Sequence, residues 1–189
     1  MAKTSSERMN IFGYIALALT CTAATLHSVG ISLPNWRITF KDDEKWVKKE
    51  GIMTLTMCKE FECTTVIEFS KIKGGEEWFF VCRVFAMFAA GLCLIATFLQ
   101  LIYFCCPKQI IRAQSMYMLG SSGLFILMSV FIFIAMYQVA QQKNSYTDIE
   151  IRLGYPVGFC IIAGVLAIAA AILTAVSSIV AERDNEDFY

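Results

Sequence analysis

Charged side chains are scarce in this sequence, and neither sign predominates. Asp, Glu, Lys and Arg make up 17% of its 189 residues, with 16 acidic and 16 basic residues, whereas ordinary soluble domains have roughly 25%. Disorder is excluded because it requires low hydrophobicity, and 57% of this chain is hydrophobic. A nucleic-acid-binding protein is not expected, because there is no positive excess to neutralise phosphates.

Histidine is nearly absent, and this limits the chemistry that the chain can carry. The one histidine, His27, lies in an apolar block away from the loop cysteines, so a zinc site with four ligands is not predicted. A proton relay would need several ionisable residues in the apolar blocks, and Arg83 is the only other charged candidate. No Ser-His-Asp order or phosphate-binding loop occurs. We therefore predict that the protein is not an enzyme and uses no cofactor.

Four long apolar blocks cover most of the sequence, at about residues 11–33, 78–106, 115–138 and 155–180. Each exceeds the ~20 residues that a helix needs to cross ~30 Å of hydrocarbon. Unbroken runs of this length favour helices over the short alternating strands of a barrel. The sequence predicts an all-α transmembrane bundle, a single four-span domain over residues 1–189 embedded in the lipid bilayer. A cleaved signal peptide is the alternative for the first block, although its apolar core is longer than the usual 7–15 residues.

Four spans place both termini on one side, and two sequence signals disagree about which side that is. Lys and Arg are concentrated in the loops 34–77 and 139–154, which the positive-inside rule would make cytoplasmic. The cysteines indicate the opposite, because Cys58 and Cys63 are the only loop pair and disulfides persist in oxidising compartments. Cys105 and Cys106, at the other end of the second block, suit cytoplasmic S-palmitoylation, with simple packing at the membrane end as the alternative. We therefore expect extracellular loops, and cytoplasmic termini that include the tail 181–189.

The loop after the first block has the pattern of β-strands. Residues 51–58 and 63–69 alternate and are rich in Thr, Val and Ile. A third strand is expected over residues 36–40, with Trp36 at the membrane boundary, where indoles prefer to lie. A four-residue hairpin loop, 59–62, would set Cys58 opposite Cys63, close enough for a disulfide that fixes the register. Two free thiols are the alternative. The sequence thus predicts a small antiparallel sheet in the first loop, outside the helix bundle.

Several of these residues resemble a known family. The segment 33–40, with Trp36 and Arg37 directly after the first span, is similar to the start of the claudin extracellular loop. Cys58 and Cys63 match the two cysteines of that loop, and Arg83 matches an arginine early in the second span. The segment 155–159 resembles the start of the fourth span.

The same residues also depart from claudins. Leu55 stands where claudins have a tryptophan, and the two cysteines are closer together than in that family. The chain is therefore identified as a divergent member of the wider superfamily of claudins, peripheral myelin proteins, epithelial membrane proteins and calcium-channel gamma subunits.

The resemblance implies both a fold and two classes of function. It implies an extracellular sheet on a four-helix bundle in the plasma membrane. It also implies a role in cell–cell contact or a paracellular barrier, through self-association or contact with other four-span proteins. The alternative is an auxiliary subunit that regulates a channel or receptor.

Three further features suggest contacts. Arg83, inside the second block, is expected to pair with an acid, for which the candidates are Glu76, Glu77, Asp148 and Glu150, since an unpaired charge in lipid is costly. Gly154 and Gly158 form a GxxxG motif that would allow close helix packing. The chain ends in Asp187, Phe188 and Tyr189, a combination of terminal carboxylate and bulky side chain that a PDZ scaffold could bind.

Overall fold

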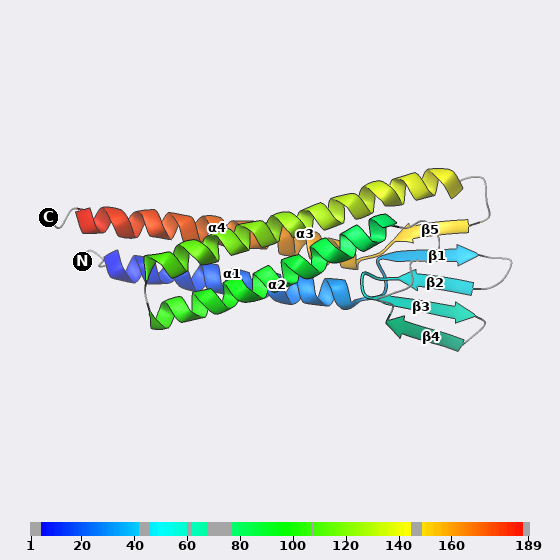
Figure 1. Cartoon of the computed structure of the whole chain (residues 1–189), viewed down its shortest axis with the longest axis horizontal. Coiled ribbons are helices and arrows are strands. Elements are labelled where there is room, and N and C mark those ends of the chain that lie inside the picture. The colour runs from blue at the N-terminus through cyan, green and yellow to red at the C-terminus, as the bar shows by residue number, and fades with distance from the viewer. Residues whose placement is uncertain are drawn as a thin grey trace. The chain divides into compact units, whose positions relative to one another are not determined.

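In the computed structural model the chain forms long helices and one antiparallel sheet, and the structure describes residues 5–41, 46–59, 62–67, 77–106, 108–144 and 149–186 (Figure 1). Within these ranges the helices are α1 (Ser5–Ser32), α2 (Glu77–Cys105), α3 (Gln109–Asn144) and α4 (Pro156–Glu186). The strands are β1 (Arg37–Lys41), β2 (Trp46–Glu50), β3 (Thr54–Lys59), β4 (Glu62–Ile67) and β5 (Ile149–Leu153).

All four helices contain a segment that is long and apolar enough to cross a membrane. These segments are Ile11–Ser32, Trp78–Cys105, Gln109–Gln142 and Pro156–Ile179. Large apolar side chains on them are exposed, among them Phe131 at 71%, an arrangement that suits lipid but is unfavourable in water. The prediction of a multi-pass membrane protein with four spanning helices is confirmed at this level.

The chain divides into two compact units, and each helix contributes one stretch to each unit. The helix unit comprises residues 1–25, 88–125 and 162–189. The sheet unit comprises residues 26–87 and 126–161 and includes all five strands.

Small side chains form the core of the helix unit. Its buried cluster consists of Ala23, Cys93, Ala96, Leu119, Ala167, Ala170 and Ala171. Small residues let helix backbones approach closely, which drives association where no water is present to be released. At Gly123 of α3, an added Cβ would lie 2.7 Å from Ile168 Cγ1 and 3.0 Å from the Gly164 oxygen of α4. This close approach leaves no space for any side chain larger than hydrogen.

Three buried serines of α3 form a ladder of hydrogen bonds to α2 at a seven-residue interval. Ser115 donates to the Ala96 carbonyl at 3.3 Å, and Ser122 donates to the Ala89 carbonyl at 2.9 Å, both in the helix unit. In the sheet unit, Ser129 donates to the Cys82 carbonyl at 3.0 Å. The seven-residue repeat is that of packed helices, in which equivalent positions return to the same seam every two turns.

We expect Ser122→Ala to destabilise the protein by about 0.6 kcal/mol, the typical value of one interhelical hydrogen bond in a membrane. The check is the thermal unfolding midpoint in detergent micelles. Ser32→Ala is the matched control, because Ser32 is exposed and its hydroxyl donates to the Ser28 carbonyl of its own helix. Equal effects of the two substitutions would contradict a role of the ladder in helix pairing.

The sheet of the sheet unit has the strand order β4-β3-β2-β1-β5, and every neighbouring pair is antiparallel (Figure 1). The small antiparallel sheet is confirmed, but the prediction that the first loop alone forms it is wrong. β5 comes from the loop between α3 and α4 and pairs with β1. α3 lies beside this strand, and its Tyr137 hydroxyl donates to the Ile151 carbonyl at 3.0 Å.

The strands of the first loop also differ in detail from the prediction. β1 begins at Arg37 instead of Trp36, and β3 begins at Thr54 because residues 51–53 form a bend. β2 was not predicted, since Trp46–Glu50 carries two lysines and a glutamate and lacks a clear alternation. The Cys58–Cys63 hairpin is tighter than the predicted four-residue loop, because Lys59 and Glu62 already pair across it.

Candidate functional site

The strand registers place the side chains of the sheet on two faces. Residues that are directly opposed in neighbouring strands share a face, and successive residues alternate. One face, called the Arg37 face, carries Arg37, Thr39, Lys48, Glu50, Met57 and Ile151. The other, called the disulfide face, carries Ile38, Phe40, Val47, Thr56, Cys58 and Cys63.

Trp36 connects the last turn of α1 to the sheet. Its side chain is completely buried, and its indole Nε1–H donates to the Gly30 carbonyl at 2.7 Å. Its ring packs edge-on against Phe133 of α3, with 5.1 Å between the ring centres. Trp36 is therefore an internal anchor and not an exposed side chain, and its position at the membrane boundary stays a prediction.

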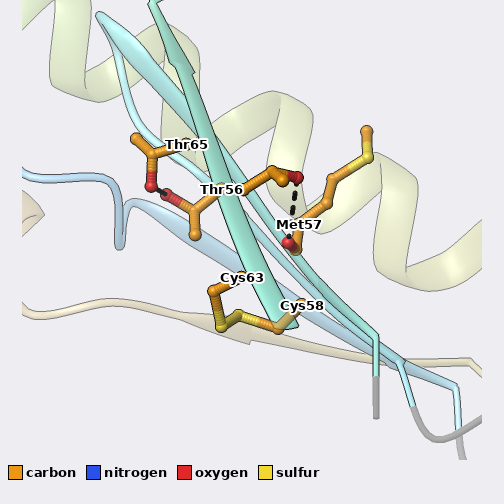
Figure 2. Close-up of a disulfide and its surroundings, with 6 residues drawn as sticks. Thr56, Met57, Cys58, Cys63 and Thr65 are labelled. Atoms are coloured by element: carbon orange, nitrogen blue, oxygen red, sulfur yellow. Dashed lines mark hydrogen bonds between the residues drawn. A yellow bond between two sulfur atoms is a disulfide. The ribbon is translucent and has the colours of Figure 1, made fainter. Parts of the chain in front are cut away.

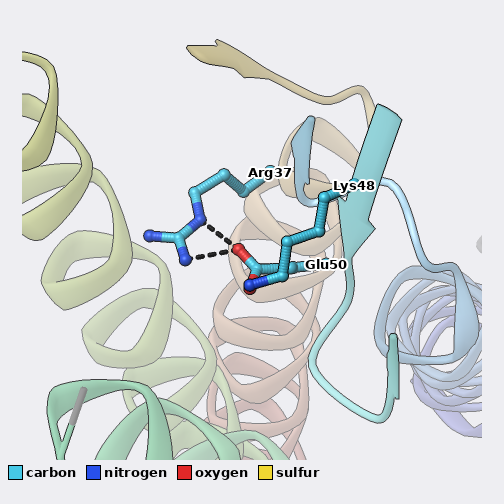
Figure 3. Close-up of polar contacts among 3 residues, drawn as sticks. All are labelled: Arg37, Lys48 and Glu50. Atoms are coloured by element: carbon cyan, nitrogen blue, oxygen red, sulfur yellow. Dashed lines mark hydrogen bonds and ion pairs between the residues drawn. The ribbon is translucent and has the colours of Figure 1, made fainter. Parts of the chain in front are cut away.

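Directly after this anchor, Arg37, Glu50 and Lys48 form a charged cluster (Figure 3). The Arg37 guanidinium binds Oε2 of Glu50 through both Nε and Nη2, and Lys48 Nζ binds Oε1. Arg37 and Glu50 are both buried, and the guanidinium carbon lies 5.9 Å from the centre of the Trp78 ring. The neighbouring strands β1 and β2 thus bring opposite charges together near the point where the chain passes from α1 into β1.

The electrostatics of this cluster favour the ionised carboxylate. Burial by itself raises the pKa of Glu50, but the hydrogen bond and charge of Arg37, followed by those of Lys48, outweigh it and lower the pKa. The carboxylate therefore stabilises the folded sheet at neutral pH. Arg37 was singled out by sequence, whereas its partner Glu50 was not, because only the β1–β2 register brings the two together.

A disulfide joins Cys58 of β3 to Cys63 of β4, as predicted (Figure 2). The two residues are directly opposed, with their Cα atoms 4.1 Å apart. On the same face, the Thr56 and Thr65 hydroxyls are hydrogen-bonded at 3.1 Å. The disulfide and the threonine pair together fix the register of a hairpin at the edge of the sheet.

Of the four predicted charge partners of Arg83, only the side chain of Glu150 is described. The guanidinium carbon lies 5.0 Å from the centre of the Phe79 ring one turn earlier in α2. Glu150 instead pairs with Arg152, its neighbour in β5, at 2.7 Å. Glu76 and Asp148 lie outside the described residues, and the side chain of Glu77 is not among those described.

Gly154 and Gly158 do not form the predicted GxxxG packing surface. α4 begins at Pro156, so Gly154 precedes the helix. Its N–H donates to the Trp36 carbonyl at 3.0 Å, and an added Cβ would lie 1.4 Å from the Asn35 oxygen. Gly158 is exposed, and an added Cβ there would meet nothing within 4 Å. Gly154 is required instead for the close approach of the segments that lead into β1 and out of β5.

We expect Gly154→Ala to destabilise the protein by about 1–3 kcal/mol, the usual cost of forcing extra volume into a packed site. The check is the thermal unfolding midpoint in detergent. Gly158→Ala is the matched control, and it should leave the midpoint unchanged or raise it slightly, because alanine favours helix more than glycine does. A smaller effect at residue 154 than at residue 158 would contradict the assigned roles.

Two of the remaining predicted residues, Cys105 and Cys106, belong to the helix unit. Cys105 is the last residue of α2, and Cys106 follows in a bend; both are free and exposed. Asp187, Phe188 and Tyr189 lie outside the described residues. No three His, Cys, Asp or Glu side chains lie close enough together to hold a metal ion in the part of the chain that the structure describes.

His27 lies within the sheet unit, where its imidazole is almost completely buried. Its Nε2 is 2.9 Å from the Ala86 carbonyl of α2. This contact joins α1 to α2. A packing role therefore explains why a histidine occurs in an apolar span.

Comparison with known proteins adds no family. No protein-family model matches the chain, and no curated protein sequence matches it. The function is therefore argued from the sheet and the helices themselves.

Proposed function

We propose that this chain is a claudin-like plasma-membrane protein whose sheet lies outside the cell and makes cell–cell contacts or a paracellular barrier by binding a second four-span protein, including another copy of itself. The observation that carries the proposal is a disulfide-linked hairpin at the edge of a sheet attached to four membrane helices. An adhesive role requires a rigid surface. Both faces of this sheet have rigid contacts: the Arg37–Glu50 cluster on the Arg37 face, next to the buried Trp36, and the disulfide on the other face.

The proposed orientation rests on the cysteines. The Cys58–Cys63 disulfide is stable in the oxidising extracellular space. Cys105 and Cys106 are exposed at the C-terminal end of α2, in keeping with palmitoylation on the cytoplasmic side. In this orientation both termini are cytoplasmic.

The edge strand β4 offers a specific mode of contact. It pairs only with β3 among the described strands, and Glu62, Cys63, Thr64 and Thr65 are all exposed. The short Cα separation at Cys58–Cys63 is that of a non-hydrogen-bonded pair, for which about 4.5 Å is typical. Since the two kinds of pair alternate, Thr65 is also in a non-hydrogen-bonded pair, and its backbone N–H points away from β3. A strand of a neighbouring molecule can bind this N–H by extending the sheet.

A substitution at Thr65 tests this contact in cells that lack junctions of their own. Cells that express the wild-type chain should aggregate, and Thr65→Pro should abolish aggregation because proline has no N–H to donate. Thr65→Ala is the matched control, since it also loses the hydroxyl contact with Thr56 but keeps the N–H. Surface expression of each variant is measured by labelling intact cells.

Two results would count against the proposal. Labelling of Cys58 and Cys63 after reduction only in permeabilised cells would invert the orientation. Absence of aggregation, together with stoichiometric co-purification of a channel or receptor, would instead support an accessory subunit.

A further inference from the structure

Arg112 is a buried cation in the helix unit whose contacts with described side chains are with neutral groups. It is 6% exposed. Its guanidinium donates to the Tyr103 hydroxyl at 3.4 Å and to Ser177 Oγ, and its carbon lies 5.3 Å from the centre of the Tyr103 ring. Among the described residues, the ion pairs involve Arg37, Lys48 and Arg152 but not Arg112. Burial of a charge without an opposite charge is strongly unfavourable, so this site favours an anion.

Arg112 lies near the N-terminal end of the apolar segment of α3, and we infer that this end reaches the membrane surface. It lies one turn after the start of the helix at Gln109, inside the segment Gln109–Gln142 and just before the uncharged block that begins at about residue 115. The connection from α2 is short, and its Cys105, Cys106 and Lys108 are exposed. A bilayer presents a dense layer of phosphate groups just outside its hydrocarbon core.

Two neighbouring features add to the preference for an anion. The backbone N–H of Arg112 bonds to the Lys108 carbonyl at 3.4 Å, so these two cations are one helical turn apart. The first turn of α3 also contributes the partial positive charge of a helix N-terminus. One turn before Tyr103 on α2, Gln100 is 6% exposed, and neither atom of its amide has a hydrogen-bond partner among the described residues.

We propose that Arg112, Lys108 and the Tyr103 hydroxyl bind the phosphate group of an anionic lipid at the short-loop end of the helix unit. The guanidinium supplies charged donors, the hydroxyl completes the hydrogen bonding of the phosphate, and Lys108 supplies a second charge at the exposed side. The proposal depends on the four membrane spans but not on cell–cell contact, so the two can fail separately.

Lipid titration of the full chain tests the site. Delipidated protein in a neutral detergent is titrated with phosphatidylglycerol and, separately, with phosphatidylcholine, and the bound species are counted by native mass spectrometry. Wild-type protein should bind one phosphatidylglycerol more tightly than any phosphatidylcholine, whose ammonium group offsets its phosphate. Arg112→Gln should weaken that binding about tenfold, the loss expected for a hydrogen bond to a charged group.

Two further variants keep the test decisive. Lys108→Gln changes an exposed side chain that does not affect folding, and it should weaken binding about threefold even if Arg112→Gln fails to fold. Arg152→Gln removes an exposed arginine of β5 and should change nothing. Equal phosphatidylglycerol affinity in wild type, Arg112→Gln and Lys108→Gln would overturn the proposal. If inorganic phosphate stabilised the protein against heat and no lipid adduct formed, the proposal that the phosphate group belongs to a lipid would be wrong.

Discussion

Trp36→Ala is expected to lower the free energy of unfolding by about 3–5 kcal/mol, the range for truncating a buried large aromatic side chain. The indole is completely buried, bonds to the Gly30 carbonyl and packs against Phe133. Its loss would leave a cavity between α1, α3 and the start of β1, as well as a carbonyl without its donor. The measurement is thermal or denaturant unfolding in detergent, followed by the fluorescence of the remaining tryptophans.

One variant separates the contribution of the ring from that of its N–H, and a second variant serves as a control. Trp36→Phe keeps an aromatic ring and should show a smaller loss of stability than Trp36→Ala. Phe131→Ala truncates an aromatic side chain that is 71% exposed on a spanning helix, and it should have little effect in detergent. If Trp36→Ala were no more destabilising than Phe131→Ala, the anchor assigned to Trp36 would be wrong.

Glu50→Gln is expected to cost about 3–5 kcal/mol, because it removes the carboxylate charge that binds the buried Arg37 guanidinium. The same substitution should change how stability depends on pH. The pKa of Glu50 is lowered in the folded state, so its stabilising effect is fully present above its unfolded pKa of about 4.5. That effect is lost as the pH falls below this value and through the lowered pKa of the folded state.

Unfolding midpoints from pH 7 downward test the prediction. Wild type should lose more stability than Glu50→Gln between neutral and strongly acidic pH, so the two curves converge at low pH. Glu150→Gln serves as the control, because Glu150 pairs with Arg152 at the exposed surface and such pairs contribute about 0–1 kcal/mol. Parallel curves for wild type and Glu50→Gln would show that the Arg37–Glu50 pair does not stabilise the ionised carboxylate.

Features that depend on one continuous segment were predictable from the sequence. The four spans follow from the length and hydrophobicity of single runs, and the Cys58–Cys63 disulfide follows from two alternating strands separated by a short turn. In both cases the interacting residues are close in sequence, so their geometry depends on local periodicity. The hairpin loop is shorter than predicted, because Lys59 and Glu62 belong to the strands. The cysteines remain opposed, since each strand is longer by one residue at this end.

Features that depend on distant segments were not predictable in the same way. β5 joins β1 although more than a hundred residues separate them, and nothing in Ile149–Leu153 specifies that partner. The three serines of α3 have ordinary neighbours in sequence, and only the antiparallel packing of α2 against α3 aligns them with three carbonyls. Gly154 suggested helix packing by its spacing from Gly158, but the start of α4 at Pro156 removes it from the helix.

The sequence alone determined that this protein has four helices long and apolar enough to cross a membrane and carries a cross-linked β-hairpin, because apolar length and strand alternation are local properties of the chain. Only the tertiary structure decided that Trp36 is buried, that Glu50 neutralises Arg37, and that Arg112 is buried beside Tyr103 and Ser177. The physical reason is that burial and charge pairing depend on which surfaces meet. In a chain with few charged residues, one strand register or one helix contact decides the partner of each charge.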